Sequence, residues 1–170
     1  MRVPVTGAAG FIGSHVCDRL LADGHEVLGL DNFNDFYNPE IKERNIAGAM
    51  GHPKFQLARV DITDSSLVLG AFEGFRPDRV IHLAAWAGVR PSIENPSVYQ
   101  QVNLGGTMNL LEACRAFQVQ HFIFASSSSV YGDRETLPFA EDDDVGQPVS
   151  PYAATKRAGE LLCYTWHHLF

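Results

Sequence analysis

The sequence predicts an α/β fold built on one doubly wound parallel sheet. Short apolar strands alternate with helical patterns along the chain, and a glycine-rich turn, VTGAAGFIG, follows the first strand. Strands that are separated by helices need crossover connections, which make the strands parallel. The 170 residues suit a single domain. We therefore expect one sheet with the strand order 3-2-1-4-5.

The first half of the chain contains three strand patterns and three helical patterns. Strands are expected at 2–6, 26–30 and 55–60, and helices at 11–23, 40–50 and 65–72. Apolar residues at helical spacing predict the first helix, and Gly24 is a typical helix stop. Pro4 is unexpected inside the first strand, because proline lacks the N–H of a sheet ladder and is usually found at sheet edges.

The second half continues the alternation of strands and helices. Strands are expected at 79–83 and 121–125, a long helix at 96–117 and a final helix from 150–151. The segments VIHLAA and FIFA are largely apolar, which is typical of strands covered by helices on both faces. A polar, acidic loop is expected at 132–150. The last helical pattern has no stop signal, so we expect the N-terminal portion of a longer protein, truncated before a C-terminal substrate lobe.

Composition narrows the classes of partner. The net charge of −7 argues against a nucleic-acid partner, which requires a basic face. No signal peptide opens the chain, and no apolar stretch approaches the ~20 residues that span a membrane. Three widely spaced cysteines are typical of reduced thiols in a cytoplasmic protein. The histidines lack metal-ligand spacing, so no metal site is expected, and His82 is interpreted as a packed strand residue.

The glycine turn has the features of a dinucleotide site. Gly7 permits a tight turn, Gly10 leaves room for a diphosphate, and Gly13 lets the helix pack against the strand. The helix that follows offers free N–H groups to phosphates. Asp31 ends the next strand, 18 residues after Gly13, where it could accept hydrogen bonds from ribose hydroxyls. Its charge would repel a 2′-phosphate, so NAD is predicted rather than NADP.

A tyrosine and a lysine near the end of the chain form a candidate acid–base pair. Tyr152 and Lys156 are four residues apart and therefore share one face of a helix. A nearby ammonium group lowers the pKa of a phenol, which could then remove a proton from a sugar hydroxyl. Such a pair alone is usually structural. The glycine turn and the serine run SSSS that precede it make it the best candidate for the chemistry.

The spacing GxxGxxG and the segments HLAA, SSSSVYG and PYAATK resemble the extended short-chain dehydrogenase/reductase family. The resemblance extends over essentially the whole chain and implies a Rossmann-type NAD-binding domain at 1–170. It also implies a set of cofactor-binding positions in the turn, at three strand ends and on two helices. These are Gly7, Gly10, Phe11, Ile12, Gly13, Asp31, Asn32, Asp61, Ile62, Leu83, Ala84, Ala85, Asn103, Tyr152 and Lys156.

The same resemblance implies the reaction. Ser127, 25 positions before Tyr152, becomes the third catalytic residue beside Tyr152 and Lys156. Dehydratases of the family carry an acid pair at the positions after this hydroxyl, and related decarboxylases carry a glutamate. This chain has Ser128 and Ser129 at those positions. Without these acids, the reaction that remains is oxidation of the sugar at C4 to a 4-keto sugar, followed by reduction from the other face. This reaction is an epimerisation. The substrate-binding candidates are Arg90, Ser127, Ser128, Ser129 and Tyr152.

Longer segments narrow the substrate. DNFNDFYNPEIKERNI, AGVRPSIENP and SPYAATKRAGELL resemble UDP-glucuronate 4-epimerases, which implies conversion of UDP-glucuronate to UDP-galacturonate. The alternatives are a UDP-glucose/galactose 4-epimerase, a nucleotide-sugar dehydratase, or an NAD-binding module without turnover. The resemblance also implies a homodimer through the long helix and the final helix. Trp86 and Pro91 depart from the glutamine and tyrosine that related epimerases usually carry, which leaves the pocket shape open.

Overall fold

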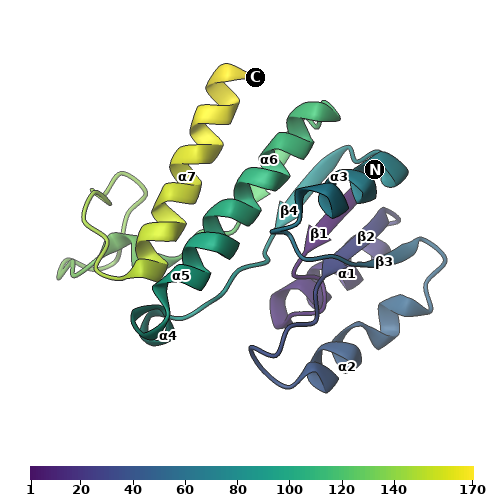
Figure 1. Ribbon diagram of the computed structural model, residues 1–170, viewed down its shortest axis with the longest axis horizontal. Coiled ribbons are helices and arrows are strands. Elements are labelled where there is room, and N and C mark those ends of the chain that lie inside the picture. The colour runs from purple at the N-terminus through teal and green to yellow at the C-terminus, as the bar shows by residue number, and fades with distance from the viewer.

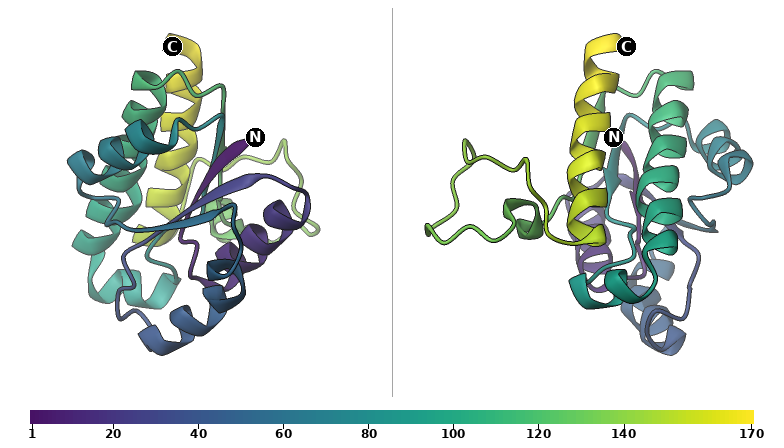
Figure 2. Two further views of the ribbon diagram at one scale, coloured as in Figure 1. Left: turned by 90° about the vertical axis from the view of Figure 1, so that its right-hand side faces the viewer. Right: turned by 60° about the vertical axis from the view of Figure 1, so that its left-hand side comes forward.

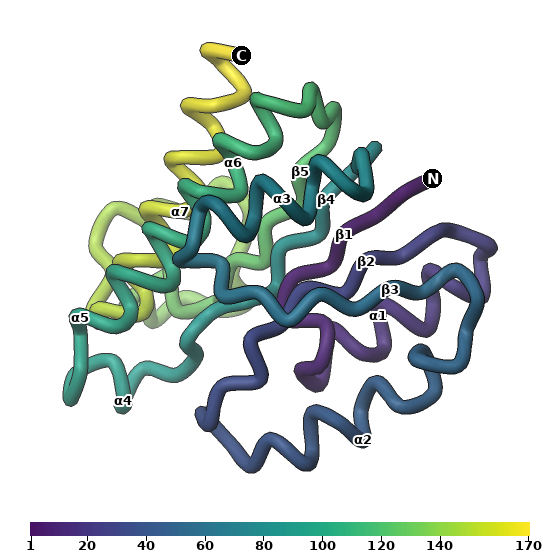
Figure 3. The backbone as a smooth tube through the Cα atoms, turned by 45° about the vertical axis from the view of Figure 1, so that its right-hand side comes forward, coloured from purple at the N-terminus to yellow at the C-terminus, as the bar shows by residue number.

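A computed structural model describes residues 1–170 and confirms the predicted sheet. Five parallel strands lie side by side in the order β3-β2-β1-β4-β5 (Figure 3). The strands are β1 (Arg2–Thr6), β2 (Glu26–Asp31), β3 (Phe55–Arg59), β4 (Arg79–His82) and β5 (His121–Phe124). Each lies within one residue of its expected limits.

Helices cover the two faces of the sheet in two layers (Figure 1). One face carries α1 (Phe11–Ala22) and α2 (Pro39–Met50), and the other carries α3 (Ser65–Phe75), α6 (Thr107–Ala116) and α7 (Pro151–Leu169). Each face has its own apolar core. The core under α1 and α2 contains Val3, Val5, Ala8, Cys17, Leu21, Val27, Ala49 and Phe55. The core under α3 and α6 contains Leu28, Leu30, Val60, Ile62, Val68, Phe72, Phe75, Val80, Leu110, Ala113 and Cys114.

The long helix expected at 96–117 is not a uniform α-helix. It consists of α5 (Pro96–Tyr99), a π-helical segment η1 (Gln100–Gly106) and α6, and a short helix α4 (Val89–Glu94) precedes it. The widened turns occur where the helix is held by neighbours on several sides. A Cβ atom on Gly106 would lie 2.4 Å from Ile62 Cδ1, so the helix contacts the loop after β3 directly. Single-sequence periodicity does not report such tertiary contacts.

Pro4 lies in the central strand, yet it costs the sheet little. Gly7 N–H donates to Leu30 O in β2, and Asp78 N–H donates to Arg2 O on the other side. Odd-numbered residues of β1 therefore bond to β2, and even-numbered residues face β4. The pairing of β1 with β4 covers only Val5 and Thr6, so Pro4 precedes the paired stretch. The missing N–H of Pro4 therefore lies outside the two paired positions of β1 and β4.

The expectation that both faces of every strand are covered is wrong for β5. Ile123 in the middle of this edge strand is 53% exposed, because no helix covers the α1 side of β5. After β5, a short 3₁₀ helix η2 (Ser128–Tyr131) leads into the loop at 132–150. That loop has no helix or strand and extends away from the body of the molecule (Figure 2).

Candidate active site

A cleft opens at the carboxyl ends of β1 to β4, where a doubly wound sheet is expected to bind ligands. Its lining residues come from the end of β2, from the segments that follow the strands, from α2 and from η1. They are Gly7, Gly10, Leu30, Asp31, Asn32, Asn34, Phe36, Tyr37, Lys42, Val60, Asp61, Ile62, Leu83, Ala84, Ala85, Trp86 and Val102. Nine of the predicted cofactor residues are among them, namely Gly7, Gly10, Asp31, Asn32, Asp61, Ile62, Leu83, Ala84 and Ala85.

The glycine turn brings backbone into close contact at three positions. Gly7 has a φ of +68°, and a Cβ there would lie 2.9 Å from Ala84 N. A Cβ on Gly13 would lie 2.0 Å from Gly7 O, so only glycine lets α1 start this close to the strand end. A Cβ on Gly10 would lie 3.1 Å from Gly7 O and 3.8 Å from the Tyr37 hydroxyl. A side chain at Gly10 would therefore occupy the space between the turn and Tyr37.

Helix α1 begins at this turn without a side-chain cap. Gly10 occupies the N-cap position and supplies no side chain, whereas Asp64 caps α3 and Ser150 caps α7. The first N–H groups of α1 are consequently available to an anion. The side chains of Phe11 and Ile12 are 74% and 63% exposed and lie outside the cleft. Only their backbone N–H groups can serve the predicted cofactor site.

Asp31 is buried at the end of β2, and its carboxylate is already partly engaged. Oδ2 accepts a hydrogen bond from Ala9 N–H at 3.1 Å, and Oδ1 accepts one from Phe33 N–H at 2.8 Å. The Lys42 ammonium lies 3.6 Å from Oδ1. Each oxygen keeps a further acceptor site for a ribose hydroxyl. Lys42 itself was not identified from the sequence.

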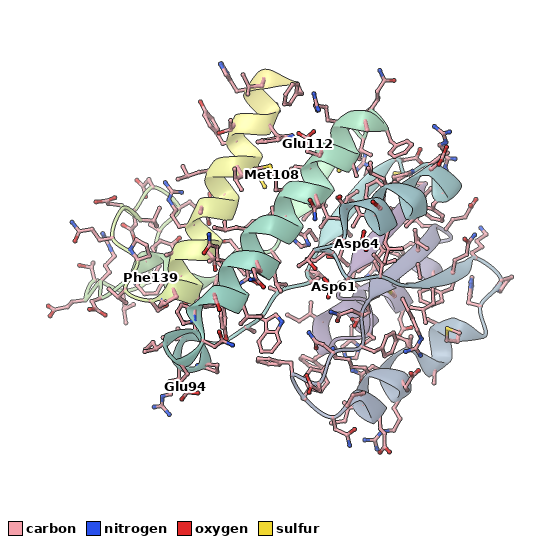
Figure 4. All side chains as sticks on the ribbon, viewed as in Figure 1. Asp61, Asp64, Glu94, Met108, Glu112 and Phe139 are labelled. Atoms are coloured by element: carbon pink, nitrogen blue, oxygen red, sulfur yellow. The ribbon has the colours of Figure 1, made fainter.

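Asp61 follows β3 and lies in the middle of the molecule, between α6 and the strand ends (Figure 4). Its carboxylate accepts hydrogen bonds from Thr63 N–H, from Thr63 Oγ1 and from Asn32 Nδ2 at 2.9 Å. Burial raises the pKa of Asp61, but these hydrogen bonds outweigh burial, so the pKa is lowered below its ordinary value. The side chain is therefore an ionised acceptor at the wall of the cleft.

Asn103 lies under the cleft and does not line it. Its Oδ1 accepts from Trp86 N–H at 2.8 Å, and its Nδ2 donates to Trp86 O at 3.0 Å and to Thr155 Oγ1 at 3.2 Å. Both amide hydrogens are therefore used within the protein. The side chain holds the loop after β4 in place and ties it to α7.

The three catalytic candidates gather at the amino end of α7. The Lys156 ammonium is buried and donates to Ala125 O at 2.8 Å. Burial lowers its pKa to about 8. Ser127 Oγ donates to Ser129 Oγ at 3.2 Å and accepts from Ser129 N–H. Tyr152 is half-buried, and no hydrogen bond joins it to Ser127 or Lys156.

A chain of aromatic rings links Tyr152 to the cleft. The Tyr152 ring lies 6.2 Å from the Tyr99 ring, Tyr99 lies 6.3 Å from Trp86, and Trp86 lies 5.3 Å from Phe36. Each pair meets edge to face, a favourable geometry for aromatic rings. Tyr99 is fully buried, and its hydroxyl donates to Ala87 O at 2.7 Å. Trp86 is thus part of the cleft wall and also a neighbour of the catalytic region.

The remaining candidates are placed as follows. The side chains of Arg90 and Ser128 are exposed and form no hydrogen bond or ion pair within the protein. His82 is buried as expected, between Thr6 Oγ1 at 2.7 Å and Thr107 Oγ1 at 3.0 Å. Three or more His, Cys, Asp or Glu side chains never come together as they would around a metal ion. None of the helices combines the length and apolar character of a membrane span.

Sequence reasoning missed several cleft residues on the loop after β2 and on α2. Asn34, Phe36, Tyr37 and Lys42 all line the cleft, and all lie within the segment DNFNDFYNPEIKERNI. Its length and polarity immediately after Asp31 were the available signal, because the loop after the second strand borders the adenosine side of a dinucleotide site.

Comparisons with known proteins agree with this arrangement. At 47% identity over 166 residues, the chain matches a UDP-glucuronate 4-epimerase from Thermodesulfobacterium geofontis, covering 98% of this chain and 51% of that protein. A UDP-glucuronic acid 4-epimerase from Bacillus cereus, solved with UDP-glucuronic acid and NAD, superposes with a TM-score of 0.90 at 38% identity. The match covers 100% of this chain and 53% of that one.

A second solved structure represents a neighbouring activity. The UDP-glucose 4-epimerase of Thermus thermophilus, in complex with NAD, gives a TM-score of 0.85 at 41% identity, over 99% of this chain and 51% of that one. The chain spans about half the length of the curated relatives it matches. The model of one protein family, the NAD dependent epimerase/dehydratase family, matches residues 3–170. The chain therefore belongs to the NAD dependent epimerase/dehydratase family, as the resemblance of its motifs implied.

Proposed function

We propose that the protein is an NAD-dependent UDP-sugar 4-epimerase and that its substrate is UDP-glucuronate. The observation that carries the proposal is the position of Lys156, which is buried one helical turn after Tyr152 and hydrogen-bonded to Ala125 O, two residues before Ser127. This brings the Tyr152 phenol, the Lys156 ammonium and the serine run at 126–129 to one end of α7. The ring chain from Tyr152 to Trp86 connects that end with the cleft.

The cleft fits NAD on three observations. Gly10 places no side chain between the turn and Tyr37, the N–H groups at the start of α1 have no side-chain cap, and the buried Tyr37 hydroxyl at the cleft has no hydrogen-bond partner within the protein. The N–H groups of the turn would hold the diphosphate, and Asp31 would accept from the adenosine ribose. Ala84 and Ala85 would border the nicotinamide half. NAD, when bound, supplies the hydride acceptor and donor at C4.

Tyr152 is the proposed base for the substrate. Its phenolate takes the proton of the C4 hydroxyl as the C–H bond at C4 is oxidised, and returns that proton when the 4-keto sugar is reduced from its other face. The Lys156 ammonium favours the phenolate electrostatically. The Ser127 hydroxyl would turn its hydrogen from Ser129 Oγ to the reacting oxygen, while it still accepts from Ser129 N–H.

The choice of UDP-glucuronate rests on two supports. Ser128 and Ser129 offer hydroxyls where dehydratases carry acids, so a C5 carboxylate can be hydrogen-bonded without a strong acid beside it. Relatives at 47% identity bear the name UDP-glucuronate 4-epimerase. The second candidate is a UDP-glucose 4-epimerase, which the match at 41% identity supports. Turnover of UDP-glucose at the rate of UDP-glucuronate would contradict the first choice.

The test of the chemistry is the variant Tyr152→Phe. It should retain NAD binding and lower epimerisation by about 10² to 10⁴, because it removes the proposed base and leaves the cleft intact. The measurement combines calorimetric NAD titration with chromatographic separation of UDP-glucuronate from UDP-galacturonate. Undiminished turnover by the variant would remove Tyr152 from the mechanism.

A chain that binds NAD but does not turn over is the candidate from another class. This reading is supported by the coverage, since the chain spans about half the length of its relatives. NAD binding without conversion of either UDP-sugar would select it. Conversion of either sugar by the wild-type chain would exclude it.

We further propose that the protein forms a homodimer. A groove between η1, α6 and α7 is lined by apolar residues such as Leu104, Met108 and Leu161, and Met108 faces α7 in Figure 4. We assign it to a homodimer contact through these helices, which sedimentation of wild type and Leu161→Glu would test.

We also propose the cytoplasm as the location, because all three cysteines are free thiols.

A further inference from the structure

Tyr37 carries a buried hydroxyl without a partner. Its Oη forms no hydrogen bond within the protein, although buried hydroxyl groups are usually paired. The residue lies on the loop between β2 and α2, and it lines the cleft. Leaving such a group unpaired is unfavourable, so a polar atom of a ligand is the natural partner.

The position of this hydroxyl relates it to the glycine turn. A Cβ atom on Gly10 would lie 3.8 Å from Tyr37 Oη, and Gly10 is the uncapped N-cap residue of α1. The hydroxyl and the free N–H groups of α1 therefore serve the same region of the cleft. Both are hydrogen-bond donors, and donors gathered at a helix N-terminus suit an anion.

Lys42 holds the tyrosine and adds positive charge. Its ammonium lies 5.3 Å from the centre of the Tyr37 ring and donates to Asn34 Oδ1 at 2.7 Å. It also lies 3.6 Å from Asp31 Oδ1, so it offsets the negative carboxylate beside the anion region. Burial, together with the charge of Asp31, raises the pKa of Tyr37 and keeps its hydroxyl protonated as a donor.

We propose that the Tyr37 hydroxyl is a hydrogen-bond donor to the diphosphate of the bound dinucleotide, with Lys42 as its positioning residue. This inference rests on the proposed NAD site and adds two residues that the motifs do not assign. The diphosphate is chosen over the ribose because Gly10 and the start of α1, which face the hydroxyl, provide phosphate-binding N–H groups. At the ribose, Asp31 already supplies the hydrogen-bond acceptor for the hydroxyl groups, so a tyrosine donor is not needed there.

The variant Tyr37→Phe tests this assignment directly. It keeps the ring and its packing and removes a hydroxyl that bonds to nothing in the ligand-free protein. We expect calorimetric affinity for NAD and for ADP to fall about tenfold, while affinity for adenosine stays within twofold. The thermal midpoint of the ligand-free protein should be unchanged or slightly raised. Tyr164→Phe, which alters a tyrosine that is 70% exposed on α7, is the matched control.

The outcomes separate the inference from the proposed function. Unchanged affinity for NAD in Tyr37→Phe, with wild type binding normally, overturns the inference alone. An equal loss for adenosine assigns the hydroxyl to the ribose and also overturns it, as does a fall in the thermal midpoint that marks a structural hydroxyl. A wild-type chain that binds neither NAD nor ADP overturns both proposals. Lys42→Met should weaken ADP binding as well, since it removes the cation beside Tyr37.

Discussion

The ammonium of Lys156 and the carbonyl oxygen of Ala125 are joined by a 2.8 Å hydrogen bond between α7 and the loop after β5. The bond fixes a cation inside the protein, between the edge strand and the helix that carries Tyr152. The same ammonium lies 5.0 Å from the centre of the Phe124 ring. One carbonyl and one ring face replace the water that a surface lysine would have, which explains why burial lowers its pKa.

The buried ammonium predicts how stability depends on alkaline pH. The pKa of Lys156 is about 8 in the folded protein and about 10.5 in the unfolded chain, so the unfolded chain binds more protons between these values. The contribution of Lys156 to the free energy of unfolding should therefore rise by about 2 kcal/mol between pH 7.5 and pH 10. Urea unfolding of wild type and Lys156→Met at both values measures it. A constant difference between the two proteins would contradict the lowered pKa.

The buried His82 predicts how stability depends on acidic pH. Burial, with a smaller contribution from the positive charge of Lys156, lowers its pKa from 6.5 to about 3. As the pH falls below 6.5 the unfolded chain takes up a proton that the folded protein does not, so stability is lost. The loss from this group between pH 7 and pH 4.5 should be about 2 kcal/mol. In urea unfolding, the free energy of unfolding of His82→Asn should fall less toward acidic pH than that of wild type. An equal fall in both proteins would contradict the lowered pKa of His82.

Asn103 distinguishes a structural role from a direct cofactor contact. Asn103→Ala leaves the N–H and O of Trp86 without their partners, so we expect a loss of about 2 kcal/mol in the free energy of unfolding as well as weaker NAD binding. Asn103→Asp keeps the acceptor for Trp86 N–H and places a carboxylate against Trp86 O, and it should fare no better. Weaker NAD binding with unchanged stability would favour the direct contact that the family resemblance implies.

A pair of glycines tests the packing of the first turn. Gly13→Ala places a methyl group 2.0 Å from Gly7 O, and backbone must shift to admit it, so we expect a loss above about 3 kcal/mol or no folded protein. Gly48→Ala is the control, because nothing lies within 4 Å of its Cβ position in α2. It should stabilise the protein by about 0.5–1 kcal/mol. Thermal unfolding followed by circular dichroism compares the two, and similar midpoints would refute the close contact.

The order of the sheet and the location of the cleft could be predicted from the sequence. Alternating strands and helices leave few topologies once crossovers are right-handed, and the glycine turn marks the first strand end. The boundaries of α1 and the start of α7 also followed from local signals. Gly10, Gly24 and Ser150 each act within a few residues, so no distant contact was needed to place them.

The parts that were missed depend on contacts between distant segments. The π-helical segment η1 is maintained by Ile62, which lies about forty residues away in sequence, at one side of the helix, and by α7 at the other. Tyr37 on the loop after β2 and Lys42 on α2 reach the cleft because this segment folds back toward Gly10, a path that periodicity does not encode. The hydrogen bonds of Asn103 to Trp86 were missed for the same reason, since the two residues are 17 positions apart.

The ring chain from Phe36 to Tyr152 gives the molecule an optical reporter of its own. Of the two tryptophans in the sequence, Trp86 forms part of the cleft wall, whereas Trp166 lies near the end of α7 against Phe170. A nucleotide that enters the cleft changes the surroundings of one indole and leaves the other untouched. Emission from a Trp166→Phe variant would therefore read out occupancy without any label.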